Sequence, residues 1–140
     1  MDHSRLLAAI LHNQERLIAT IAFEDPDDRN LYGLHLQFTN KSFYITASAD
    51  YDEIIVSSQK PLILRDNDLQ PRRHPGLLAN AYGKTLSWYW WMTNQQGYQD
   101  GLQLEFGIGE TVSCMQAIAI ATCLSIRSTI PDTLFSHFNS

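Results

Sequence analysis

The chain is poor in cysteine, in basic side chains and in long apolar runs, and each shortage excludes a class of protein. Cys114 and Cys123 are its two cysteines, and their spacing fits neither a C-x-x-C motif nor a zinc site. We therefore expect two buried thiols and no structural disulfide. No window approaches the apolar length of a membrane-spanning helix, and no basic segment followed by an apolar run opens the sequence. These absences predict a cytoplasmic protein without a membrane segment.

Basic charge is scarce as well, with 10 Lys and Arg residues against 15 Asp and Glu residues and a net charge of −5. A nucleic-acid partner requires clustered Lys and Arg, so none is expected. Carboxylates cluster twice, in residues 25–28 and 50–53, but neither cluster has the glycine placement or distant glutamate of an EF-hand loop. We interpret both clusters as solvated turns and expect no metal and no cofactor.

The remaining composition is that of one globular domain, residues 1–140, with 44% hydrophobic and 18% charged residues. Residues 3–14 have the periodicity of an amphipathic helix. From residue 16 onward the period changes to two, which is typical of half-buried strands. The segment 111–127 fits either strands or a buried helix. The patterns predict an α+β fold, mainly antiparallel β, with the N-terminal helix packed on a sheet made of two similar three-stranded meanders.

An internal pseudo-repeat relates about 16–58 to about 84–126, joined by an irregular loop over 59–83 that contains three prolines. At an offset of 68 positions, Gly33-Leu34-x-Leu36-x-Phe38 falls on Gly101-Leu102-x-Leu104-x-Phe106. This pattern predicts a duplication, and a chance likeness between two β-meanders is the alternative.

The aromatic run Trp88-Tyr89-Trp90-Trp91 is the most unusual feature of the sequence. Alternation places Trp88 and Trp90 on one face of a strand and Tyr89 and Trp91 on the other. Either the strand is covered on both faces or one face binds a partner or a ligand. Stacking on single-stranded nucleic acid would need a basic surround, which the neighbouring sequence lacks.

The turn after this strand carries a dense set of hydrogen-bonding groups, from Asn94 to Asp100. Asn, Asp and Gly are the residues that a turn requires. Gln95, Gln96 and Tyr98 are not required for turning, so they are candidates for recognition, because loops on rigid strands often carry function.

His35 and Glu105 form the one acid–base pair that the sequence suggests. Each lies on the polar face of an L-x-L-x-F strand, and if those strands pair, the carboxylate would raise the pKa of the imidazole. No nucleophile elbow, metal set or phosphate loop accompanies them, so we do not expect an enzyme.

The segment N-Q-Q-G-Y-x-D-G-L-x-L-x-F, preceded by Gly83-Lys84-Thr85-Leu86, resembles a family of small bacterial proteins catalogued as a domain of unknown function. Leu34-x-Leu36-x-Phe38 and the turn Asp50-x-Asp52-Glu53-Ile54 are similar to that family too, and the likeness extends from the first helix to about residue 126. The resemblance implies a compact bacterial domain and no assigned activity. By analogy, small bacterial proteins of this kind include immunity and antitoxin-like factors.

The expected function is therefore a non-enzymatic protein-binding domain. Its partner would be a second copy, as a homodimer through the aromatic sheet, or a toxin or regulatory protein, as for an immunity factor. The alternative is a small-molecule-binding domain with a pocket between the two meanders, lined by Trp88, Trp90, His35 and Glu105.

Overall fold

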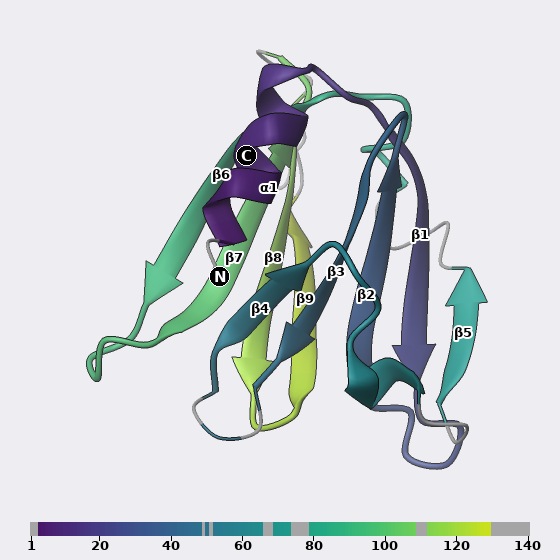
Figure 1. The fold of residues 1–140 in the computed structure, drawn as a ribbon, viewed down its shortest axis with the longest axis vertical. Helices are drawn as coiled ribbons and strands as arrows, with labels where there is room; N and C mark the ends of the chain where they lie inside the picture. Colours follow the sequence, from purple (N-terminus) through teal and green to yellow (C-terminus); the bar gives the residue numbers. More distant parts are fainter. Residues whose placement is uncertain are drawn as a thin grey trace, which may run out of the picture.

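Two antiparallel sheets lie face to face, and a helix lies beside them at one side (Figure 1). The computed structural model describes residues 3–48, 50, 52–65, 69–73, 79–108 and 112–129. The first sheet has the strand order β4-β3-β2-β1-β5 and the second has the order β6-β7-β8-β9. The elements are α1 (His3–His12), β1 (Leu17–Glu24), β2 (Leu31–Phe38), β3 (Ser42–Ala47), β4 (Ile54–Ser57), the 3-10 helix η1 (Leu62–Arg65), β5 (Gln70–Arg73), β6 (Leu86–Thr93), β7 (Gln99–Phe106), β8 (Ser113–Ile120) and β9 (Cys123–Thr129).

The predicted fold class, α+β with mainly antiparallel strands and an N-terminal helix, is confirmed. The finer arrangement differs in two ways. The segment that fitted a strand or a helix forms β8 and β9, so each half contributes four consecutive strands rather than three. The two meanders also form separate sheets instead of one, because each has an apolar face and each face covers the other.

Helix α1 ends with a Schellman motif that turns the chain toward β1. The amide of Glu15 donates to the carbonyl of Ile10 at 3.3 Å, and the amide of Gln14 donates to Leu11 at 3.2 Å. Gln14 adopts a φ of 53°, the left-handed conformation that closes such a motif. Leu7 and Ile10 are fully buried and pack where the helix contacts β6 and β4. No helix in the described part of the chain is long and apolar enough to cross a membrane.

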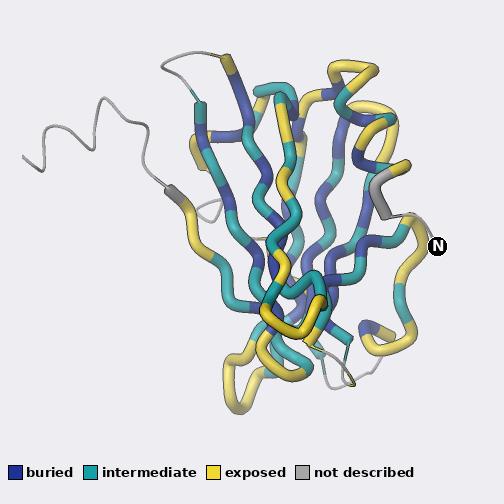
Figure 2. The backbone as a smooth tube through the Cα atoms, turned by 90° about the vertical axis from the view of Figure 1, so that its left-hand side faces the viewer, coloured by how far each residue is buried: buried dark blue, intermediate teal, exposed yellow. Residues whose placement is uncertain are grey.

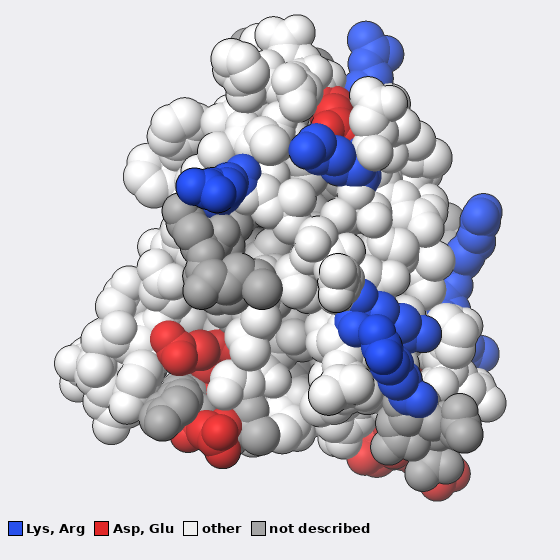
Figure 3. Space-filling view, viewed as in Figure 1, with Lys and Arg blue, Asp and Glu red and all other residues white. Residues whose placement is uncertain are grey.

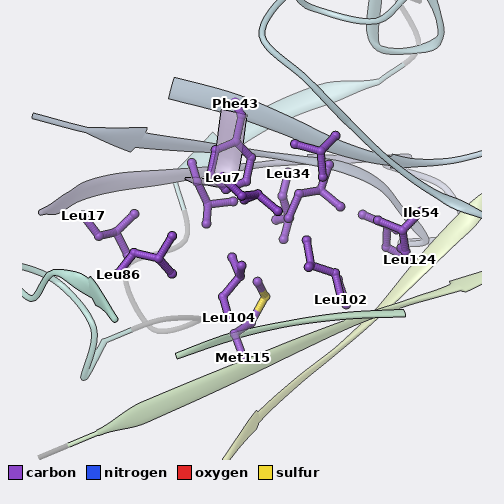
Figure 4. Close-up of a cluster of buried hydrophobic side chains, with 14 of the residues drawn as sticks. Leu7, Leu17, Leu34, Phe43, Ile54, Leu86, Leu102, Leu104, Met115 and Leu124 are labelled. Carbon is purple, nitrogen blue, oxygen red and sulfur yellow. The ribbon is translucent and has the colours of Figure 1, made fainter. Parts of the chain in front are cut away.

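The core lies between the two sheets and contains side chains from both (Figure 4). The rings of Phe38 and Phe106, one from each sheet, lie nearly parallel with centroids 6.3 Å apart. The space in which a ligand pocket was predicted is therefore occupied by packed apolar side chains. They include Leu34, Leu36, Phe43, Ile45, Leu102, Leu104, Met115 and Ala117.

A bulge at the start of β6 changes which side chains face the core. Leu86 pairs with Phe106 and Trp88 with Glu105, so Ser87 is an extra residue. Simple alternation would put Leu86 and Trp88 on one face, but one inserted residue reverses every side chain that follows. Leu86 is buried in the core, whereas Trp88 lies on the opposite, outer face.

β1 pairs with β2 in the way that β6 pairs with β7, with a bulge near the start of the strand. Leu17 pairs with Phe38, and a register shift follows before Ala19 pairs with Gln37. The two halves also meet symmetrically, because Arg16 forms an isolated bridge with Thr85. The amide of Leu17 donates to Lys84 at 3.0 Å, and the amide of Leu86 donates to Glu15 at 3.4 Å.

The connection over 59–83, predicted as irregular, contains η1 and β5. β5 pairs with β1 at the edge of the first sheet, with Pro71 opposite Phe23. The proline argued against a strand, but an edge strand can accept a residue that lacks an amide hydrogen. The predicted loop residues 66–68 and 74–78 lie outside the described residues.

Candidate functional site

The outer face of the second sheet is the candidate surface, and it is defined by the side chains that point away from the core. Two indoles dominate it, because Trp88 is 48% exposed and Trp90 is 54% exposed. Trp91 lies on the other face, half-buried against the core. The strand registers place these residues on the outer face: Trp88, Trp90 and Met92 of β6, Gln103 and Glu105 of β7, Gln116 and Ile118 of β8, and Ser125 and Arg127 of β9.

A row of hydrogen bonds crosses this face from β8 to β6. Gln116 donates from Nε2 to Oε1 of Gln103 at 2.8 Å, and Gln103 donates from Nε2 to Oε2 of Glu105 at 3.0 Å. The indole Nε1 of Trp90 donates to the same Glu105 oxygen at 2.5 Å. The ring of Trp88 meets that of Trp90 edge-on, with centroids 6.0 Å apart. The row therefore holds an exposed indole in one orientation.

The equivalent face of the first sheet is covered in part, around Gly33 and Phe23. Leu64 of η1 is 2% exposed and lies over Gly33, where a Cβ would stand 2.7 Å from its methyl carbons. The Lys60 ammonium lies 5.1 Å above the ring of Phe23, which is also buried. On the second sheet the position that matches Gly33 is Gly101, where the nearest atoms to a Cβ belong to Met92, its partner in β6 of the same sheet.

The turn between β6 and β7 is built by its asparagine. Oδ1 of Asn94 accepts from the amides of Gln96 at 2.9 Å and Tyr98 at 3.1 Å. Gly97 supplies the left-handed conformation with a φ of 88°. Gln95 and Gln96 are exposed, whereas Tyr98 and Asp100 are half-buried. Asn94 therefore has a structural role here, and Gln95 and Gln96 are the exposed amides beside the aromatic strand.

Of the comparisons with known proteins, the one with protein families gives a match that includes this surface. A family model described as a family of unknown function, DUF6334, matches residues 6–130. The chain belongs to DUF6334. The predicted membership of an uncharacterised family is thereby confirmed, and the match includes the whole candidate surface on β6 to β9. No curated protein and no solved structure matches the sequence.

In this DUF6334 chain the predicted pair of His35 and Glu105 does not form. β2 and β7 belong to different sheets, and their inward leucine and phenylalanine side chains face each other across the core. His35 and Glu105 therefore point outward on opposite sides of the molecule. Periodicity shows which face a residue occupies, but it does not show which strands pair. The residues predicted to line a ligand pocket are not brought together either, because Trp88, Trp90 and Glu105 lie on the outer face of the second sheet and His35 on that of the first.

His35 is stacked instead on Tyr44, its neighbour in β3, with ring centroids 4.0 Å apart and 7° between the planes. Its Nε2 is buried and has no hydrogen-bond partner among the described residues. Burial lowers the pKa of His35 below the ordinary value, and the charge of Lys60 lowers it further. The neutral ring is thus the form that the fold favours.

A pH-dependent stability follows from this lowered pKa. Above about pH 6.5 the ring is neutral in both the folded and the unfolded chain, and as the pH falls the unfolded chain takes up the proton first. We expect the free energy of unfolding to decline as the pH falls below about 6.5, and to become constant below the lowered pKa of His35 in the folded chain. Urea unfolding at about pH 7.5 and about pH 5 would show a steeper loss for the native chain than for His35→Gln. Parallel pH profiles would contradict this expectation.

Of the other groups that the sequence singled out, Cys114 lies on the outer face opposite Glu105, whereas the carboxylate clusters lie in turns. Among the described residues, no three His, Cys, Asp or Glu side chains are placed to hold a metal ion. Cys114 and Cys123 form no disulfide and are half-buried rather than buried, because they lie on the outward side of β8 and β9. An open groove of about 430 Å³ lies between α1 and β4, and another of about 440 Å³ lies near the Arg16–Thr85 bridge. Neither groove includes a predicted site residue.

Proposed function

We propose that this chain is a protein-binding domain that presents the outer face of its second sheet to a protein partner. The partner is a second copy of the chain or a toxin or regulatory protein. The single observation that carries the proposal is the pair of exposed indoles, Trp88 and Trp90, on a face whose counterpart in the first sheet is covered in part by η1.

The chemistry of the face supports a protein contact. Tryptophan is enriched among the residues that dominate binding energy at interfaces, since it offers a large apolar area with one polar group. Here the polar group of Trp90 is already satisfied by Glu105, so the ring can be covered without leaving its N–H unpaired. The fixed indole also loses little side-chain entropy on binding.

The distribution of charge also supports a partner at this side of the molecule. Figure 3 shows the left-hand margin, over the β6–β7 turn, without Lys, Arg, Asp or Glu, whereas charged side chains are spread over the rest of this view. β6 itself carries no charged side chain, and an uncharged strand with two exposed indoles has the composition of an interface centre.

Site-specific photo-crosslinking tests the proposal. A photoreactive phenylalanine analogue at position 88, in cells that express the protein at its natural level, should give one discrete adduct. The matched control is the same analogue at Ile18, a 57% exposed apolar position at the start of β1, which should give none. An adduct of twice the chain's mass identifies a second copy, and any other discrete mass identifies a different partner. Absence of an adduct at position 88, or equal labelling from both positions, would overturn the proposal.

A further inference from the structure

We infer that the free edge of β6 pairs with β6 of a second copy, antiparallel about a two-fold axis at Trp90, so that the two second sheets become continuous. This inference rests on the proposed function and names its partner and its mode of contact. It is carried by a difference between β6 and the other edge strands, and not by the exposed face alone.

Four described strands form sheet edges, and three of them have features that discourage pairing. β5 contains Pro71, Arg72 and Arg73, β4 is four residues long, and β9 carries the exposed Arg127. Prolines, charged side chains and short length are the means by which native sheets avoid pairing with other chains. β6 has none of them: it is eight residues long, without Pro, Lys, Arg, Asp or Glu.

The edge of β6 is also accessible in the described part of the structure. Figure 2 looks onto the left-hand side of Figure 1, where β6 is the foremost strand and no described segment passes in front of it. α1 contacts β6, but its buried residues Leu7 and Ile10 belong to the core and therefore lie on the inner side of the strand. A strand of another chain can thus approach β6 in the plane of the second sheet.

The properties of β6 favour a copy of itself as that strand. Residues opposite each other in an antiparallel pair lie on the same face. When a strand pairs with its own copy, the two-fold axis therefore lies midway between one residue and the same residue of the copy. Axes at Tyr89 and at Trp90 overlap the two strands equally, and the axis at Trp90 is the one that centres the contact on the outward residues Trp88, Trp90 and Met92. Trp90 then lies beside its copy, and Trp88 lies beside the copy's Met92. Because β6 is uncharged, this pairing brings no like charges together.

Oligomeric state measured over a concentration series tests the inference. Light scattering after size exclusion should give twice the chain's mass, falling to the monomer on dilution. Trp90→Lys places two ammonium groups opposite each other and removes the aromatic pair, so it should weaken dimerisation about tenfold or more. Ser125→Lys is the matched control, because it adds the same charge to the same face on β9, at the far edge of the sheet. It should leave the dimer intact.

Disulfide trapping fixes the position of the axis. Opposite residues in an antiparallel pair have Cα atoms about 4.5–5.5 Å apart, which suits a disulfide. With Cys114 and Cys123 replaced by serine, Trp90→Cys should form a covalent dimer under mild oxidation, and Ser125→Cys should not.

The outcomes separate this inference from the proposed function. A strict monomer at all concentrations overturns pairing through β6, and an adduct at position 88 with a different protein would then preserve the binding surface. A dimer abolished by Ser125→Lys as well as by Trp90→Lys would show face-to-face association, which also overturns the edge pairing. A dimer that survives Trp90→Lys and resists trapping at position 90 overturns it too.

Discussion

Replacing Phe106 by alanine is expected to lower the free energy of unfolding by about 3–5 kcal/mol, because the change leaves a cavity between the two sheets. The Phe106 side chain is fully buried and stacks on Phe38 of the facing sheet. It also pairs across the strands with Leu86, beside the bulge of β6. Neither sheet can close the cavity without moving against the other, so the cost should fall in the upper part of the range for such truncations.

Chemical denaturation monitored by circular dichroism would measure this loss. Ile120→Ala is the control, since it also truncates a large apolar side chain in the second sheet but at a position that is 59% exposed. Its effect should stay within about 0.5 kcal/mol. Equal losses for the two variants would contradict the placement of Phe106 between the sheets.

Glu15→Ala is expected to cost about 2–3 kcal/mol, through hydrogen bonds rather than packing. Glu15 is 2% exposed, and its Oε1 accepts from the amides of Asn40 at 2.7 Å and Lys41 at 2.8 Å. The side chain therefore ties the end of α1 to the turn between β2 and β3. Alanine would leave both amides without this acceptor.

Glu15→Gln tests the contribution of the hydrogen-bond acceptor separately from that of the negative charge. Glutamine keeps an oxygen for the two amides but loses the strength of a charged acceptor, so we expect a loss of about 1 kcal/mol in urea unfolding. Amide hydrogen exchange at Asn40 and Lys41 should accelerate in the alanine variant more than in the glutamine variant. Unchanged exchange in both variants would show that the turn is held by other contacts.

Much of the fold could be predicted from periodicity, because the patterns are strong where one face is buried. The amphipathic period of residues 3–14 predicted a helix with one buried face, which Leu7 and Ile10 provide, and the L-x-L-x-F strands lie in the core as their alternation predicts. The bulges after Leu17 and Leu86 could not be predicted, because one extra residue need not differ in type from the other residues of a strand. β5 was missed because Pro71 is acceptable only at an edge, and sequence alone does not locate edges.

Some features of the candidate site could likewise be predicted from the sequence, and others could not. Trp88 and Trp90 stood out by residue type and share one face, as alternation predicts. The pairing of His35 with Glu105 required two strands to be neighbours, which is a property of topology. The contrast between the two outer faces was also unpredictable, because Gly33 and Gly101 occur in the same motif. It arises from Leu64, which reaches Gly33 only once the connection over 59–83 has folded back.

The predicted duplication stays a prediction, and the strand registers support it. The shift that follows Leu17 in the first sheet recurs after Leu86 in the second, and a further shift recurs after Phe23 and after Met92. Both irregularities recur at an offset of 69 positions rather than 68, because the β1–β2 turn is one residue longer than the β6–β7 turn. Bacterial origin stays a prediction as well, and so does a toxin-like partner, which the photo-crosslinked species would test.

The order of strands also bears on how the chain folds. Every pair in the second sheet joins strands that follow each other in sequence, and in the first sheet only β1–β5 does not. Hairpins of this kind close short loops at a small entropic cost, so each meander can form by successive local steps. The contacts between distant residues, including the Arg16–Thr85 bridge and the Phe38–Phe106 stack, arise when the two meanders dock. Docking is therefore the step that we expect to limit the folding rate.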